Sequence, residues 1–299
     1  MSNTAVLQRN EARERRTAIA RLGRDLTPEC LRASQALFAP LHESEPYSGV
    51  LLHRDQAYGP DPRHRLDVFE PVGARGAAPV LIYIHGGGFV RGDKKAAGLP
   101  FFDNIGLWAA RCGFLGITAT YRLAPQHRAP AGATDIGAVL AWVRDKARLY
   151  GGDPGRIVLM GHSAGAVHAA CHVAGPGFQV AKTTPLAGLV LCSGLYDFSR
   201  VEEAEGLKAY FGDNYRSHSP LPGLLRAGLP TLVGIGGIEP RDFEVQALHL
   251  ADALLKRDGR LPRFVRSDGQ NHYTSMFQIN FRTNNSLQAE LERFIGDGV

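Results

Sequence analysis

Two short apolar runs, each leading into a glycine-rich motif, constrain the fold of this chain more than any other feature. Val-Leu-Ile-Tyr-Ile at 80–84 precedes His-Gly-Gly-Gly-Phe at 85–89, and Ile-Val-Leu-Met at 157–160 precedes Gly-His-Ser-Ala-Gly at 161–165. Such continuous apolar runs are typical of strands buried on both faces of a parallel sheet. Ligands of these sheets bind beyond the carboxyl ends of the strands, so we expect both motifs to face one crevice.

The rest of the chain continues this alternation of strands and helices. The predicted strands are 51–57, 64–70, 79–84, 114–120, 156–161, 186–193, 229–235 and 261–266. The predicted helices are 98–112, 133–149, 164–174, 201–211, 241–257 and 284–296. Glycine- and proline-rich stretches, including 71–79 and 217–230, are predicted loops. The β-α-β alternation predicts a mostly parallel, eight-stranded sheet with helices on both faces.

The first 45 residues lack this alternation and predict two helices, at 4–22 and 28–41. The second follows Thr-Pro-Glu at 27–29, which resembles a capped helix start with proline in first position. This segment has too few large apolar residues to form a core alone. We therefore expect it to pack on the main body of the chain, residues 46–299.

Composition excludes several classes of protein. The 299 residues are 44% hydrophobic, yet no apolar run approaches the ~20 residues that span a bilayer. The first residues lack the apolar stretch of a secretory signal, so a cytoplasmic location without membrane contact is expected. A net charge of +5 without a nucleic-acid motif argues against nucleic-acid binding. Cys171 and Cys192 lie in apolar stretches and are predicted to be buried thiols.

Ser163 has the sequence context of a catalytic nucleophile. A predicted strand leads into it and a predicted helix, 164–174, leaves it, while Gly161 and Gly165 permit a tight turn between them. The partial positive charge of the helix N-terminus favours a developing anion there. Acyl transfer also needs donors for an oxyanion, and the backbone N–H groups of Gly87, Gly88 and Ala164 are the candidates.

A base and an orienting acid complete this chemistry. His272 follows the last predicted strand and precedes the last predicted helix, which makes it the expected base. The acid is expected after strand 229–235, where Glu239 is the first candidate. Asp242 is the alternative, although its place at the start of the next helix also suits a capping residue.

His168 and His172 offer a different chemistry. Their spacing of four residues on a predicted helix can bind a metal. No third ligand or general-base glutamate accompanies them, so helix packing is the expected role. His85 is expected to be a structural residue of its loop.

Five segments match a known pattern. They are Arg-Leu-Asp-Val-Phe at 65–69, His-Gly-Gly-Gly-Phe-Val at 85–90, Tyr-Arg-Leu-Ala-Pro at 121–125, Gly-Gly-Asp-Pro at 151–154 and Gly-His-Ser-Ala-Gly at 161–165. Together they resemble the α/β-hydrolase superfamily, and more narrowly the hormone-sensitive-lipase-like and acetylxylan- or feruloyl-esterase-like esterases. The order Ser163, Glu239, His272 is that of α/β hydrolases.

This resemblance implies an α/β-hydrolase fold, no metal and no organic cofactor. It implies Ser163 as nucleophile, His272 as base and an acid at the position of Glu239. The family usually has aspartate-proline where this chain has glutamate-proline, which leaves Asp242 open. It also implies a cap-like role for residues 1–45 near the mouth of a catalytic domain, 46–299.

The sequence therefore predicts a serine carboxylesterase that hydrolyses small or short-chain esters through an acyl-enzyme. Amide or formamide hydrolysis, as in an arylformamidase, uses the same groups and is the first alternative. A non-catalytic binding protein on a hydrolase scaffold is the second, and the presence of both serine and histidine argues against it. The expected partner is a small-molecule ester, and a homo-oligomer stays open.

Overall fold

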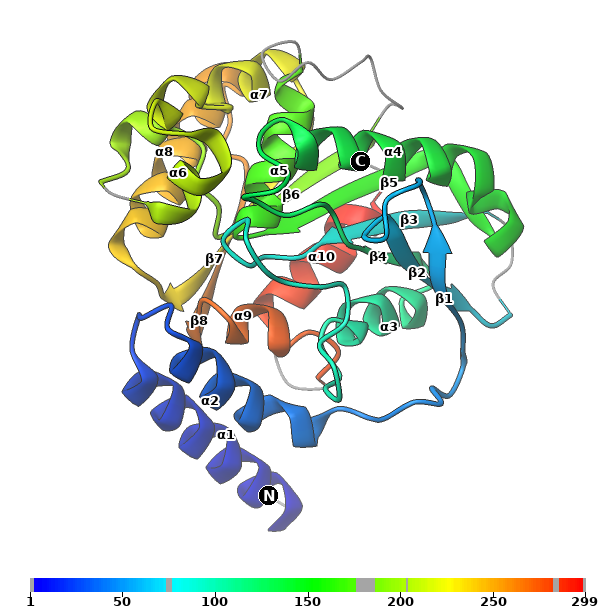
Figure 1. The fold of residues 1–299 in the computed structure, drawn as a ribbon. Helices are drawn as coiled ribbons and strands as arrows, with labels where there is room; N and C mark the ends of the chain where they lie inside the picture. The colour runs from blue at the N-terminus through cyan, green and yellow to red at the C-terminus, as the bar shows by residue number, and fades with distance from the viewer. Residues whose placement is uncertain (1–2, 74–76, 176–185, 203, 282–284, 298–299) are drawn as a thin grey trace.

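The chain folds around one twisted sheet. The computed structural model describes residues 3–73, 77–175, 186–202, 204–281 and 285–297, with side chains from residue 10 onward. Within these ranges eight strands pair in the order β1-β2-β4-β3-β5-β6-β7-β8 (Figure 1). Their bounds are β1 Val50–Ala57, β2 Arg65–Pro71, β3 Ala78–Ile84, β4 Leu115–Ala119, β5 Gly152–His162, β6 Gly188–Cys192, β7 Thr231–Ile238 and β8 Arg263–Asn271.

The direction of the strands confirms the predicted, mostly parallel sheet. β1 pairs antiparallel with β2, and β2 pairs antiparallel with β4. Every other pairing among the described strands is parallel. The carboxyl ends of β3, β5, β6, β7 and β8 consequently lie at one edge of the sheet.

Helices cover both faces of the sheet. They are α1 Asn3–Leu22, α2 Pro28–Phe38, α3 Asp103–Arg111, α4 Ala131–Lys146, α5 Ala164–Ala174, α6 Glu205–Phe211, α7 Leu221–Ala227, α8 Arg241–Asp258, α9 Thr274–Phe277 and α10 Ser286–Gly296. Short 3-10 turns are η1 Ala39–Leu41, η2 Ala147–Tyr150, η4 Phe198–Arg200 and η5 Tyr215–His218. No helix in the described ranges has both the length and the apolar character to cross a bilayer.

Three boundary predictions need correction. The loop predicted at 217–230 contains α7, which buries Leu221 and Leu224 against the core. The helix predicted at 98–112 begins only at Asp103, after Pro100, and the one predicted at 201–211 begins at Glu205. Residues 74–76, 203 and 284, which fall within predicted segments, lie outside the described residues.

Both faces of the central strands are buried, which explains their unbroken apolar sequence. Val80, Ile82 and Ile84 of β3 join one core cluster with side chains of α4, α5 and α8. Leu81 and Tyr83 join a second cluster with α3 and α10. Because successive side chains of a strand point to opposite faces, a strand between two helical layers needs apolar residues at every position.

The two N-terminal helices pack beside the β8 edge of the sheet, next to α9 (Figure 1). As predicted, Thr27 caps α2 by accepting a hydrogen bond from the Cys30 N–H at 3.2 Å, with a proline in the first turn. Ile19 and Phe38 form a small apolar cluster with Phe277 of α9. Buried Asn271 at the end of β8 donates to Ser34 Oγ on α2 at 3.1 Å, so α2 is tied to the strand by a polar contact as well.

Candidate active site

Ser163 lies on a sharp turn between β5 and α5. Its backbone has φ 55° and ψ −124°, a conformation that is costly for a residue with a side chain. The glycines on either side make the turn feasible. A Cβ at Gly161 would collide with the carbonyl oxygen of Gly165, and one at Gly165 would collide with that of Ile84. The predicted strand-turn-helix around Ser163 is therefore present.

Glu239 and His272 form a buried pair at the ends of β7 and β8. His272 Nδ1 lies 2.7 Å from Glu239 Oε2, and both side chains are almost completely shielded from solvent. With Nδ1 bonded to the carboxylate, Nε2 is the ring nitrogen left to accept a proton in the pocket. The structure thus brings together the predicted base and the first candidate for its acid.

The second carboxylate oxygen of Glu239 is also satisfied. Glu239 Oε1 accepts a hydrogen bond from Ser193 Oγ at 2.6 Å and another from the Gly236 N–H at 3.2 Å. Three donors around one buried carboxylate hold its orientation and stabilise its negative charge. Ser193 was not predicted from the sequence as part of this site. The sequence feature from which Ser193 could have been predicted is its position directly after β6, at the same edge of the sheet.

Asp242, the alternative acid, lies elsewhere. It is half-buried in the first turn of α8, on the rim of the pocket. Among the described residues the carboxylate bonded to His272 is that of Glu239. Asp242 in the first turn is suited to the positive end of the helix dipole.

The glycine motif after β3 forms a loop beside Ser163. Gly87 has φ 135° and Gly88 has φ 60°, and a Cβ on Gly87 would collide with the carbonyl oxygen of Arg91. Glycine is thus required at Gly87 by sterics as well as by φ. Gly86 passes so close to the turn that its Cβ would lie 3.0 Å from Ser163 Cβ.

The N–H groups of Gly87, Gly88 and Ala164 remain available as donors. Within the described part of the chain, none of them donates to a backbone or side-chain acceptor. Ala164 is the first residue of α5, so its N–H has no acceptor inside the helix. All three residues line the same pocket as Ser163.

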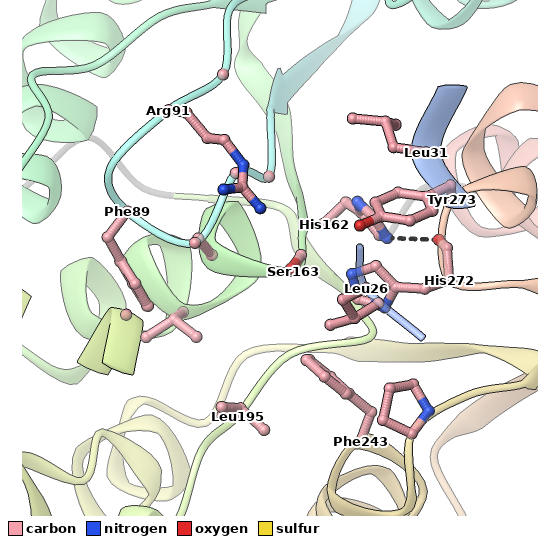
Figure 2. Close-up of a pocket in the computed structure, with 18 of the residues that line it drawn as sticks. Leu26, Leu31, Phe89, Arg91, His162, Ser163, Leu195, Phe243, His272 and Tyr273 are labelled. Atoms are coloured by element: carbon pink, nitrogen blue, oxygen red, sulfur yellow. Dashed lines mark hydrogen bonds between the residues drawn. The ribbon is translucent and has the colours of Figure 1, made fainter. Parts of the chain in front are cut away.

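This pocket has a volume of about 760 Å³ and contains both Ser163 and His272 (Figure 2). Its walls are largely apolar. They include Phe89, Leu195 and Phe243 on one side, and on another Leu26 from the link between α1 and α2 and Leu31 from α2 (Figure 2). A cavity of this size with few polar groups is typical of a small-molecule site.

His162, beside the proposed nucleophile, has a separate task. Its Nε2 lies 3.0 Å from the carbonyl oxygen of His272, shown as the dashed line in Figure 2. Burial, helped by the neighbouring His272, holds the pKa of His162 well below its usual range, so the ring stays neutral. His162 therefore fixes the main chain of His272 rather than facing Ser163.

The other buried histidines serve packing. The ring of His168 contacts those of Phe89, Tyr121 and Tyr210. His172 bonds to the Ala133 carbonyl oxygen at 2.9 Å through Nδ1. No group of three metal-ligating side chains occurs among the residues whose placement is described.

Acidification is expected to destabilise the fold because several histidines are buried and neutral. Burial lowers the pKa of His85 to about 4 and that of His168 to about 3, from 6.5 in an unfolded chain. Below about pH 6.5 the unfolded state therefore binds more protons, and stability falls as pH falls. Each such histidine removes up to about 1.4 kcal/mol per pH unit. Urea unfolding at about pH 7 and about pH 5 measures the loss.

His168→Leu provides the matched variant. Neither ring nitrogen of His168 has a hydrogen-bond partner among the described residues, so leucine breaks none of the hydrogen bonds found there. We expect the free energy of unfolding to fall less on acidification in the variant than in the parent. The slopes of this free energy against pH should differ by the contribution of about one proton. An unchanged slope would show that His168 does not contribute to the acid sensitivity.

Comparisons with known proteins agree with this geometry. A family model described as the α/β hydrolase fold matches residues 81–227. The probable carboxylic ester hydrolase LipM of Mycobacterium tuberculosis is 31% identical over 219 residues, which are 67% of this chain and 47% of LipM. Carboxylesterase NlhH of the same organism is 41% identical over 103 residues, 33% of this chain and 30% of NlhH. The aligned part of the chain thus spans less than half the length of either relative.

A solved structure resembles nearly the whole chain. Esterase B from Lactobacillus rhamnosis, inhibited by a tributyrin phosphonate, superimposes with a TM-score of 0.70 at 20% identity. The superposition covers 99% of this chain and 96% of that one. Together with the sheet order and the turn at Ser163, these matches show that the chain has the α/β-hydrolase fold.

Proposed function

We propose that the chain is a serine carboxylesterase that hydrolyses small carboxylic esters through an acyl-enzyme. The observation that carries this proposal is the buried Glu239–His272 pair. His272 of this pair lines the same pocket as Ser163, which lies on a strained turn. The names of LipM and NlhH support ester hydrolysis as the reaction.

In the first step Ser163 Oγ attacks the ester carbonyl carbon while His272 Nε2 takes the hydroxyl proton. Glu239 holds the imidazole in the required orientation and stabilises the imidazolium that forms. The carbonyl oxygen becomes an oxyanion, which the N–H groups of Gly87, Gly88 and Ala164 stabilise. The alcohol departs with the proton from His272, and the acyl group stays on Ser163.

In the second step water replaces the alcohol. His272 takes a proton from water, which attacks the acyl carbon, and the same N–H groups stabilise the second oxyanion. Collapse of this intermediate releases the carboxylic acid and returns the proton to Ser163. The reaction needs neither a metal nor an organic cofactor.

Residues 1–45 are proposed to act as a cap-like segment on the catalytic domain, 46–299. Support comes from the pocket, because Leu26, Leu31 and Gln35 of the first segment form part of its wall. The segment would therefore shape the space for the acyl or alcohol group without contributing a reacting atom.

Labelling with a fluorophosphonate probe tests the proposal. A phosphonate reacts with an activated serine and not with an ordinary hydroxyl, because attack needs the neighbouring base. We expect one probe per chain, located on the peptide that contains Ser163 by mass spectrometry, and none after Ser163→Ala. Folded protein that takes up no probe would instead favour a binding protein on a hydrolase scaffold.

A further inference from the structure

The guanidinium of Arg91 interrupts the apolar wall near Ser163. Figure 2 shows the side chain of Arg91 extending from the loop after Phe89 into the pocket, toward Ser163 and His162. Arg91 is exposed and lines the pocket. No carboxylate among the described residues pairs with it, although the chain pairs most of its buried or half-buried cations.

The backbone of Arg91 is held firmly. Its N–H donates to the carbonyl oxygen of Gly87 at 3.2 Å, and its own carbonyl occupies the space that a Cβ at Gly87 would need. Arg63 Nη2 donates to the next carbonyl, that of Gly92, at 2.8 Å. The loop that presents the N–H groups for the oxyanion therefore also fixes the point from which Arg91 reaches into the pocket.

Two other charged residues that line the pocket have partners of opposite charge. Lys95 lies 3.1 Å from Glu45 and 3.4 Å from Asp103, and Asp93 lies 3.9 Å from Arg63. The remaining two charged lining residues, Arg241 and Asp242, lie in the first turn of α8 on another wall, and no ion pair joins them in the described ranges. Among these charged groups, Arg91 is the cation that extends toward Ser163, and no carboxylate of the described residues pairs with it.

Tyr273 adds a neutral donor next to Arg91. Figure 2 shows its ring beside His162 with the hydroxyl directed into the pocket, on the side of Arg91. Burial raises the pKa of Tyr273 to about 12, so the hydroxyl keeps its proton at neutral pH. Within the described ranges this hydroxyl has no hydrogen-bond partner of its own.

We propose that Arg91 and the Tyr273 hydroxyl bind an anionic group carried by the substrate, so that the enzyme prefers apolar esters bearing a carboxylate. A planar guanidinium matches a carboxylate with two parallel hydrogen bonds, and the phenol supplies a third. This inference rests on the proposed esterase function and names the substrate class of that same site.

Two matched pairs of esters test the preference. On the acyl side, monomethyl adipate carries a carboxylate where methyl hexanoate has none. On the alcohol side, para-acetoxybenzoate is compared with para-acetoxybenzamide. We expect kcat/KM to favour the acid by about 10-fold or more in at least one pair, as for a hydrogen bond to a charged group. The ratio should shrink at high salt because Arg91 is exposed.

The variant Arg91→Gln assigns the preference to the guanidinium. We expect it to reduce the acid-to-neutral ratio of kcat/KM by about 10-fold, mainly through KM, and Arg91→Lys to restore part of the ratio. Arg241→Gln is the matched control, because it removes the same charge from another wall of the pocket. It should keep the ratio of the parent.

The outcomes separate this inference from the proposed function. A ratio near one in both pairs, with turnover that still depends on Ser163, overturns the anion site and leaves the esterase. A preference that survives Arg91→Gln, or that falls equally in Arg241→Gln, overturns the role of Arg91. Turnover that survives Ser163→Ala overturns the proposed function itself.

Discussion

Replacing Ser163 with alanine is expected to lower kcat for a short-chain nitrophenyl ester by about 10⁴- to 10⁶-fold. The hydroxyl that forms the acyl-enzyme is lost, while the N–H groups and the pocket remain. Initial rates with purified protein measure the effect. Because alanine keeps the Cβ, the strained backbone at φ 55° is unchanged and the fold should persist.

Two controls make this result specific. The melting temperature of Ser163→Ala should match that of the parent, which excludes unfolding as the cause of the loss. Ser217→Ala, which removes an exposed serine on η5, should keep the full rate. Equal rates in Ser163→Ala and the parent would exclude Ser163 as the nucleophile.

Glu239→Gln is expected to lower kcat by about 10³- to 10⁴-fold. A glutamine amide has the shape of the carboxylate but cannot satisfy its three donors. If its oxygen faces His272, its NH₂ faces the N–H of Gly236 and the Ser193 hydroxyl. If it is reversed, its NH₂ faces His272 Nδ1 and forces the proton onto Nε2, where the base must be free.

Asp242→Asn is the matched comparison, since it makes the same chemical change at the other candidate acid. We expect its kcat to stay within about 3-fold of the parent, because among the described residues the carboxylate paired with His272 is that of Glu239. Glu239→Asp should fall between the two, as a shorter side chain draws the carboxylate away from His272. The opposite ranking of the Glu239→Gln and Asp242→Asn effects would assign the acid to Asp242.

The sequence predicted the sheet well because burial on both faces leaves a direct signature. Val80 to Ile84 and Ile157 to Met160 are apolar at every position, and each run became a central strand. The helix α7 was missed because Pro222 and Gly223 lie in its first turn and Pro220 and Gly228 flank it. Leu221 and Leu224 make it helical by packing into the core, and that contact lies far away along the chain.

The candidate site was predictable where one residue type or one turn carries the chemistry. The turn around Ser163 and the position of His272 after the last strand are of this kind. The choice between Glu239 and Asp242 was not, because both follow β7 within a few residues. It depends on β7 extending to Ile238, which places Glu239 and not Asp242 beside the end of β8. Ser193 was missed because its bond to Glu239 joins distant segments.

Helix α2 has two roles, and the residues for each lie on adjacent faces of the helix. Cys30 and Ser34 face the side-chain amide of Asn271, the residue before His272. Leu31 and Gln35, each one position further along, line the pocket. Leu31 also packs against the cluster of Ile19, Phe38 and Phe277, so a mutational library at position 35 is the one expected to vary the pocket while the attachment of the helix is preserved. The same reasoning applies to natural variation: substitutions at the pocket-facing positions of α2 are expected to change the substrate preference of related enzymes.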